Sequence, residues 1–197
     1  MVLLLAAGNA AVASAQTIEV SPVGGYRVGG GFFERVTNQP VDTDGAPAVG
    51  AVVNVAMDNG AWIEGLFTHQ DARIDVPGGL LSPPARRRVT VDQWLAGSLQ
   101  EFGTSHAVRP FATGLLGLTR YATNGDSEIR FAVGAGGGVK LRPWRHVAVR
   151  LDGRLFATFA DIGGHAVGCG TGGICIAGFY ADVVWQAEFT AGLTIVF

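Results

Sequence analysis

The sequence lacks any long uninterrupted apolar segment, because polar residues break every stretch short of the ~18 residues that a membrane-spanning helix needs. It also has little charge, since only 15% of its 197 residues are charged and the net charge is −2. Proteins that bind nucleic acid use a basic excess to neutralise phosphates, and this chain has none. Neither a transmembrane helix nor a nucleic-acid partner is therefore predicted.

Cysteine is scarce as well, and Cys169 and Cys175 lie close together in the glycine-rich stretch GCGTGGIC. In an exported protein such a pair predicts a small disulfide within a loop. A metal site would need two further ligands, and only His165 lies near in the sequence. We expect no metal site and no cofactor.

Glycine is abundant: there are 30 glycines, roughly twice the share expected from a usual content of ~7%. Glycine at this density disfavours helices and suits twisted, closed sheets. The length of the chain fits one domain, or one domain with a short extra segment.

That extra segment is predicted at the N-terminus, where residues 1–15 have the pattern of a signal peptide. Val2–Ala7 are apolar, and Ala13-Ser14-Ala15 before Gln16 matches a cleavage site with small residues. The usual basic residues are missing, as they would be from a truncated signal peptide. The alternative is an apolar first strand of a soluble protein. Residues 16–197 are predicted to form the mature domain.

In the last eighteen residues, Tyr180 to Phe197, apolar residues recur at every second position. Every odd position from Ala181 onward is apolar, and the even positions carry all the polar groups. A period of two predicts a strand with one apolar face. Residues 129–141 and 147–159 show the same pattern, whereas Trp94 and Tyr121 could point either way.

Turn signals divide the chain into eight candidate strands, most of them 10 to 16 residues long. Soluble strands average only ~5–6 residues, whereas a tilted strand needs ~9–11 residues to cross a membrane. The candidate strands are Gly25–Val36, Ala48–Met57, Ala61–Asp75, Val89–Phe102, Val108–Thr123, Glu128–Leu141, Val147–Ile162 and Tyr180–Phe197.

The connections alternate in length. DNG, GTSHA and RPWRH are short, and the intervening links are longer, apart from NGDS. Short turns at one end and long loops at the other are typical of outer-membrane barrels. The sequence therefore predicts an all-β fold, an eight-stranded antiparallel up-and-down transmembrane β-barrel.

In such a barrel the polar face of each strand would point inward. An eight-stranded interior has room only for side chains, so acids and bases there should pair. With the hairpin centred on Trp144, we expect three glycines to lie opposite three long side chains: Gly138, Gly136 and Gly134 opposite Arg150, Asp152 and Arg154. The residues predicted to face inward are Arg27, Glu64, Asp92, Arg130, Lys140, Arg150, Asp152, Arg154, Asp182 and Glu188.

Three stretches, TAGLTIVF, RPFATGLLGLTRY and FAVGAGGGVKLRPWRHVAVRLDGR, resemble the small eight-stranded outer-membrane barrels of the OmpA-like and porin-like families. The resemblance extends over Gln16–Phe197. It implies export through the periplasm to the outer membrane and surroundings of outer-membrane lipid. It also implies that the barrel-assembly machinery reads Phe197 as part of the C-terminal strand signal. A monomer is expected.

The leading functional hypothesis is a non-enzymatic structural or surface barrel, or a narrow porin-like channel. One alternative is a lipid-modifying enzyme resembling lipid A deacylases, which have a serine close after the catalytic histidine. His69 has none, and Ser105 beside His106 would point away from it; His146 and His165 are expected to be solvated. The other alternative is a soluble lipocalin-like barrel, which would place its apolar faces inside.

Overall fold

A computed structural model of the chain describes residues 17–30, 32–34, 40–41, 45–57, 60–76, 85–103, 105, 107–123, 126–159, 179–180 and 183–197. Within these ranges no helix is long and apolar enough to cross a membrane. The predicted signal peptide, the cysteine pair, Asp182 and His165 lie outside the described residues.

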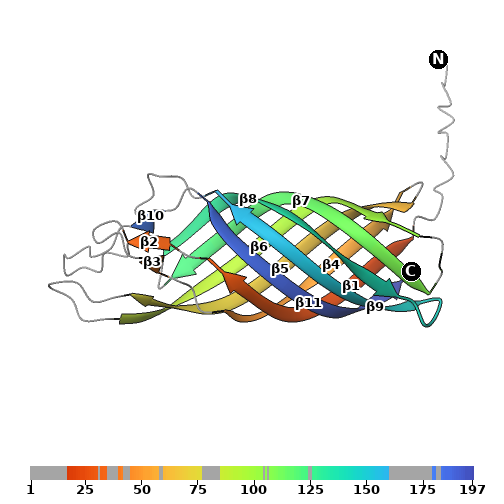
Figure 1. Ribbon diagram of the computed structural model, residues 1–197, viewed down its shortest axis with the longest axis horizontal. Coiled ribbons are helices and arrows are strands. Elements are labelled where there is room, and N and C mark those ends of the chain that lie inside the picture. Colours follow the sequence, from red (N-terminus) through yellow and green to blue (C-terminus); the bar gives the residue numbers. More distant parts are fainter. Residues whose placement is uncertain are drawn as a thin grey trace, which may run out of the picture.

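Eight antiparallel strands form a closed barrel, in the order β1-β11-β9-β8-β7-β6-β5-β4, and β4 pairs with β1 to complete the ring (Figure 1). The predicted fold class is therefore confirmed. The barrel strands are β1 (Ile18–Gly29), β4 (Ala46–Ala56), β5 (Ala61–Val76), β6 (Ala85–Glu101), β7 (Val108–Thr123), β8 (Asp126–Leu141), β9 (Val147–Thr158) and β11 (Val184–Val196).

The two ends of the barrel differ. The first and last barrel strands, β1 and β11, have their outer termini at the same end of the barrel, here called the turn end. There Phe197 N–H donates to Ile18 O at 2.8 Å. Gly60 and Gly103 adopt positive φ angles of 75° and 86° in the short connections there, a backbone region open mainly to glycine. The opposite end, the loop end, carries a small sheet of β2 (Phe32–Glu34), β3 (Pro40–Val41) and β10 (Phe179–Tyr180) (Figure 1).

Side chains alternate between the outer face and the lumen, as the period of two predicts. On β11, Trp185, Phe189 and Leu193 are 63%, 65% and 56% exposed on the outside. Their neighbours Glu188 and Thr190 are buried in the lumen. Trp94, whose direction the sequence leaves open, is exposed on the outer face. Closure gives every barrel strand a hydrogen-bonded neighbour on both sides, so this apolar outer face can meet lipid.

The first strand begins at Ile18, seven residues before its predicted start at Gly25. Pro22 and the following glycines suggest a break, but the strand continues through them. The ladder to β4 includes Pro22 opposite Ala51, whereas Ser21 and Pro22 have no paired residue on β11. Proline lacks the N–H donor, and the strand tolerates it because only one of its two ladders is interrupted.

The register of the β8–β9 hairpin also differs from the prediction, by two residues. Gly138 lies opposite Asp152 and Gly136 opposite Arg154, while Lys140 rather than glycine lies opposite Arg150. The wider turn, whose last pair is Leu141 with Val149, accounts for the shift. Close packing still requires the small residues, because a Cβ at Gly136 would lie 2.8 Å from Arg154 Cγ and 2.4 Å from Gly153 O.

The assignment of faces predicts a strong dependence on position for an added charge. Leu151→Arg, on the outer face near the middle of β9, should lower the free energy of unfolding from a bilayer by roughly 2–4 kcal/mol. Ala122→Arg, on the outer face beyond the last apolar residues of β7, should cost about 0–1 kcal/mol. Urea unfolding from lipid vesicles measures both values, and equal costs would contradict the assignment.

Candidate functional site

The lumen is filled by side chains in layers along the barrel axis. Along β5, the successive inward residues are aromatic, acidic, apolar and hydroxylic: Trp62, Glu64, Leu66 and Thr68. All four are buried. The lumen is thus a packed interior with layers of different chemistry, as expected for a barrel of this size.

The layer at the turn end is a cluster of two acids and three bases. Lys140 Nζ lies 2.5 Å from Glu19 Oε2 and 2.9 Å from Glu101 Oε1. Arg142 contacts the same two carboxylates, at 2.7 Å from Glu19 and 3.2 Å from Glu101. Arg109 adds a longer contact of 3.7 Å to Glu101. This turn-end cluster joins residues from β1, β6, β7 and β8 and from the turn after β8.

The central cluster is built around Glu64 and Arg150. Arg150 donates to Glu64 Oε2 at 2.6 Å and to Asp152 Oδ2 at 2.8 Å. Arg154 also donates to Glu64, at 3.2 Å, and Thr113 Oγ1 donates to it at 3.1 Å. Every charged group in this central cluster thus has a partner of opposite sign, which is the condition under which buried charge is tolerated.

An apolar layer follows the central cluster toward the loop end. Seven of the eight barrel strands contribute one buried apolar side chain to it, and these side chains pack against each other. The layer consists of Val23, Val52, Leu66, Leu95, Leu115, Ala132 and Phe156.

Beyond the apolar layer lies a third group of paired charges. Arg27 donates through Nε to Glu188 Oε2 at 2.8 Å, and its NH2 group also contacts Thr68 Oγ1. Gln93 and Gln186 are joined at 3.3 Å beside it. Arg27 and Glu188 are both fully desolvated, at 0% and 1% exposure.

Aromatic rings contact the cations of these layers. Lys140 Nζ lies 4.6 Å from the Trp62 ring centre. The Arg150 guanidinium lies 4.6 Å from the ring centre of Phe111, and that of Arg27 lies 5.4 Å from that of Phe156. Cation–π contacts of this kind are stronger where water is excluded. The rings therefore stabilise charges whose hydration has been removed.

Most residues predicted to face inward do so. Arg27, Glu64, Lys140, Arg150, Asp152, Arg154 and Glu188 are buried in the lumen. Arg130 has the same orientation but lies near the loop end, partly exposed and paired with Glu128 rather than with the clusters. Tyr121, whose direction the sequence leaves open, shares the inward side of β7 with Thr119.

The prediction for Asp92 is wrong, because its side chain lies on the outer face. It contacts His69 Nδ1 at 2.6 Å and Arg120 NH1 at 3.6 Å, and both partners are about 40% exposed. The inward residues of β6 include Val91, Leu95 and Leu99, which belong to the apolar parts of the lumen. A rule that places polar residues inside therefore assigns this strand to the wrong face.

The acids and both arginines of the turn-end cluster are not among the residues predicted to face inward. Glu19 precedes the predicted start of the first strand, so the sequence predicts neither an inward nor an outward direction for its side chain. Glu101 shares its parity with Leu99, and the wrong assignment of Asp92 hid it. Arg142 lies just past β8 in the turn and reaches back into the lumen. Its spacing could have revealed Glu101. It lies two residues after Leu99 and four after Gly97, so all three residues share one side of β6.

The central cluster predicts a large effect from removing one acid. Glu64→Gln leaves Arg150 and Arg154 with Asp152 as their one carboxylate partner among the described residues. Removal of one partner from a buried ion pair costs roughly 3–5 kcal/mol, measurable by urea unfolding from vesicles. Glu128→Gln is the control, because its pair with Arg130 is partly exposed and should contribute about 0–1 kcal/mol. Similar losses in the two variants would show that the lumen is hydrated.

Comparisons with known proteins agree with this architecture. No curated protein sequence matches the chain. The structure is similar to that of neisserial surface protein A, with 11% identity, a TM-score of 0.60 and coverage of 92% of this chain and 97% of the other. It is also similar to outer membrane protein OprG from Pseudomonas aeruginosa, with 12% identity, a TM-score of 0.57 and coverage of 91% of this chain and 95% of the other.

The family described as "Outer membrane protein beta-barrel domain" matches residues 1–194. The chain belongs to this family of outer-membrane β-barrel proteins.

Proposed function

We propose that the protein is a non-enzymatic outer-membrane barrel with a sealed lumen, acting as a structural or surface component rather than as a diffusion pore. The observation that carries this proposal is the apolar layer between Arg27 and the central cluster. An ion crossing the barrel would have to separate paired charges on both sides of this layer. It would also have to pass the layer itself, whose seven buried apolar side chains cannot replace its hydration shell.

The paired charges contribute to the seal for a second reason. In each cluster the carboxylates already accept hydrogen bonds from lysine or arginine. A permeating ion would need these same groups as ligands, so entry would leave their present partners buried without compensation. The clusters therefore act as fixed parts of the interior and not as binding sites along a conduction path.

A lipid-modifying enzyme is the alternative that one observation favours. His69 and Asp92 form a close pair on the outer wall, where a lipid substrate could reach them. The pair lacks a nucleophile: among the described residues, no serine or threonine hydroxyl is hydrogen-bonded to His69, and Asp71 stands two positions after it. Asp92 is shared with Arg120. This arrangement supports a structural role for His69.

Conductance tests the sealed lumen. In planar bilayers the wild-type protein should give small, rare openings, because both the apolar layer and the clusters block the path. Phe156→Ala, which shortens the largest side chain of the layer, and Arg150→Ala, which breaks the central cluster, should each increase the frequency of openings. Heat-modifiable gel mobility confirms that each variant is folded.

The neighbouring substitution Leu155→Ala is the matched control, because Leu155 is exposed on the outer face and should leave the openings unchanged. Large, stable openings of the wild-type protein would refute the sealed lumen. So would identical records for Phe156→Ala and Leu155→Ala.

The route to the membrane belongs to the same proposal. Export through the periplasm would deliver the chain to the barrel-assembly machinery, which would read the C-terminal strand. Phe197 fits such a signal, because it is 73% exposed at the turn end while its backbone pairs with Ile18. Closure of the barrel ladder leaves no free edge among its eight strands, which favours a monomer. The net charge of −2 favours no nucleic-acid partner.

Phe197→Ser separates recognition from stability. In cells this variant should assemble several-fold less into the outer membrane, because the aromatic end of the signal is lost. Refolding of the purified chain into detergent should proceed as for the wild type, since Phe197 is exposed. Phe159→Ser, another exposed aromatic residue, on the outer face just after β9, serves as the control in the same fractionation. Unchanged assembly of Phe197→Ser would remove Phe197 from the signal.

A further inference from the structure

The outer wall changes from apolar to charged within two residues on three neighbouring strands. Phe67, Trp94 and Leu118 lie directly opposite each other on β5, β6 and β7. They form what we call the interface row, in which the Phe67 and Trp94 rings stack with centres 5.8 Å apart. Aromatic residues on the outside of such barrels mark the boundary between hydrocarbon and headgroups. The interface row therefore marks where the apolar band ends on this side.

The next outward position toward the loop end is charged on all three strands. His69, Asp92 and Arg120 again lie directly opposite each other. Asp92 is in the middle and contacts both neighbours. These side chains sit at headgroup depth on the outer wall, directly above the interface row.

Two arginines face each other two outward-facing positions further toward the loop end, which is four residues along each strand. Arg73 on β5 lies directly opposite Arg88 on β6, and both are exposed. Like charges at directly opposite positions destabilise a sheet unless another group compensates them. Among the residues that the structure describes, no ion pair joins either guanidinium to a carboxylate. The nearby Asp71 accepts a hydrogen bond from Thr90 Oγ1 at 2.7 Å.

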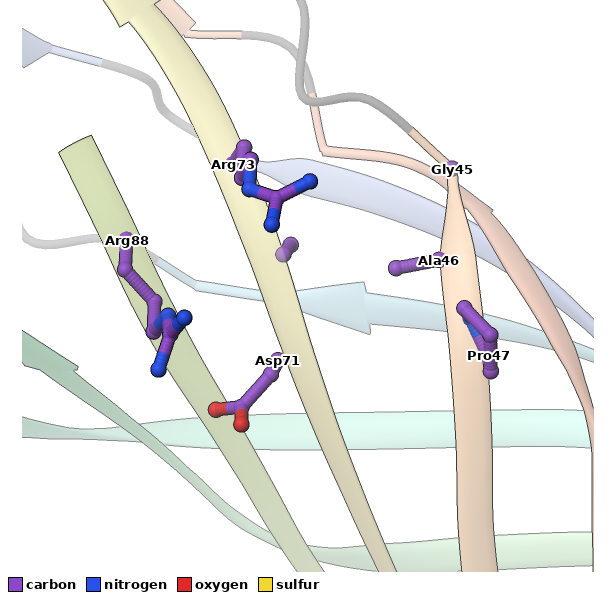
Figure 2. Close-up of a pocket in the computed structure, with 7 residues that line it drawn as sticks. Gly45, Ala46, Pro47, Asp71, Arg73 and Arg88 are labelled. Carbon is purple, nitrogen blue, oxygen red and sulfur yellow. The ribbon is translucent and has the colours of Figure 1, made fainter. Parts of the chain in front are cut away.

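A pocket lies beside these arginines because β4 and β5 separate. Their ladder ends at Ala48 opposite Gln70. The pocket, of about 290 Å³, opens beyond that point and is lined by Gly45, Ala46, Pro47, Asp71, Ala72, Arg73 and Arg88. Figure 2 shows Arg73 on β5 and Arg88 on β6, with Gly45 and the first two residues of β4, Ala46 and Pro47, on the other side of β5.

Hydrogen bonds fix the backbone on the β4 side of the pocket. The Gln70 amide donates to Ala46 O and to Arg27 O, both at 3.2 Å, on the lumen side. On the outer side, Tyr26 Oη donates to Gly45 O at 2.7 Å. A side chain at position 45 would collide with this tyrosine, because a Cβ there would lie 2.7 Å from Tyr26 Cε1.

We propose that this pocket binds the phosphate group of an anionic lipid in the outer leaflet, which lies at the loop end in barrels of this kind, with Arg73 and Arg88 as its ligands. Guanidinium groups form bidentate, charge-assisted hydrogen bonds with phosphate, and a phosphate between the two arginines removes their mutual repulsion. The lipid is the expected source of the phosphate because Pro47, Arg73 and Arg88 of the lining are exposed on the outer wall. Its acyl chains would then lie along the interface row.

The charge balance of the outer wall supports an anion rather than a metal ion. Between positions 69 and 120, the described outward side chains above the interface row include three arginines, Arg73, Arg88 and Arg120, and two carboxylates, Asp71 and Asp92. Three positive and two negative charges leave a net charge of +1. Each carboxylate already has a hydrogen-bonding partner. No group of three or more metal-ligating residues occurs within the described ranges.

Native mass spectrometry of the folded protein from neutral detergent tests the proposal. The probes are diphosphorylated lipid A, the same lipid without its phosphates, and inorganic phosphate. We expect the phosphorylated lipid to remain bound to the wild-type protein. Arg73→Gln and Arg88→Gln should each weaken its binding by roughly 10-fold or more, because each removes charged hydrogen bonds.

Arg145→Gln is the matched control, because it removes the same charge from an exposed residue in the turn between β8 and β9, at the opposite end of the barrel. Its affinity for the lipid should equal that of the wild type. Heat-modifiable mobility shows that all variants are folded. An equal loss in Arg145→Gln, or equal binding of the dephosphorylated lipid, would overturn the proposal. Competition by inorganic phosphate at the same concentration as lipid A would overturn its assignment to a lipid.

Discussion

Closure of the antiparallel ladder is the constraint on which the rest of this structure depends. Once β4 pairs with β1, every barrel side chain faces either the outer surface or a lumen wide enough only for side chains. The outer surface needs apolar groups to meet lipid, so the polar groups of the strands collect inside. They must then pair with each other, because the lumen has no room to hydrate them separately. The ion pairs of Glu64, Glu188 and Lys140 follow from closure.

Pairing of charges alone would leave a polar interior that water could enter. The apolar layer of Leu66, Leu115 and their neighbours divides this interior into compartments. Each compartment contains acids and bases in contact, and aromatic rings of Trp62, Phe111 and Phe156 lie against their cations. The lumen therefore resembles the core of a soluble protein with ion pairs built into it, and this resemblance is what supports a closed barrel.

The strand count, the antiparallel topology and the outward face of β11 could be predicted from the sequence, because lipid imposes a strict period of two on the outer surface. The lumen imposes no such rule. It accepts Leu95 and Glu101 on the same face of β6, so polarity gave the wrong direction for Asp92. The register of a hairpin depends on turn geometry, which placed Lys140 opposite Arg150. Pro22 concealed the start of β1 because a strand can lose one donor without ending.

Asp92 also shows that the outer wall ceases to be apolar before the strands end, since β5 and β6 continue past Phe67 and Trp94.

The central claim, a lumen closed by an apolar layer, is tested most directly by the accessibility of single thiols. In a chain with Cys169 and Cys175 replaced by serine, Leu115→Cys lies in the layer and Thr123→Cys at the loop-end rim. In lipid vesicles a water-soluble maleimide should label the thiol at position 123 and leave the one at position 115 unmodified until the protein is unfolded. Labelling of both thiols at comparable rates in the folded protein would contradict the account.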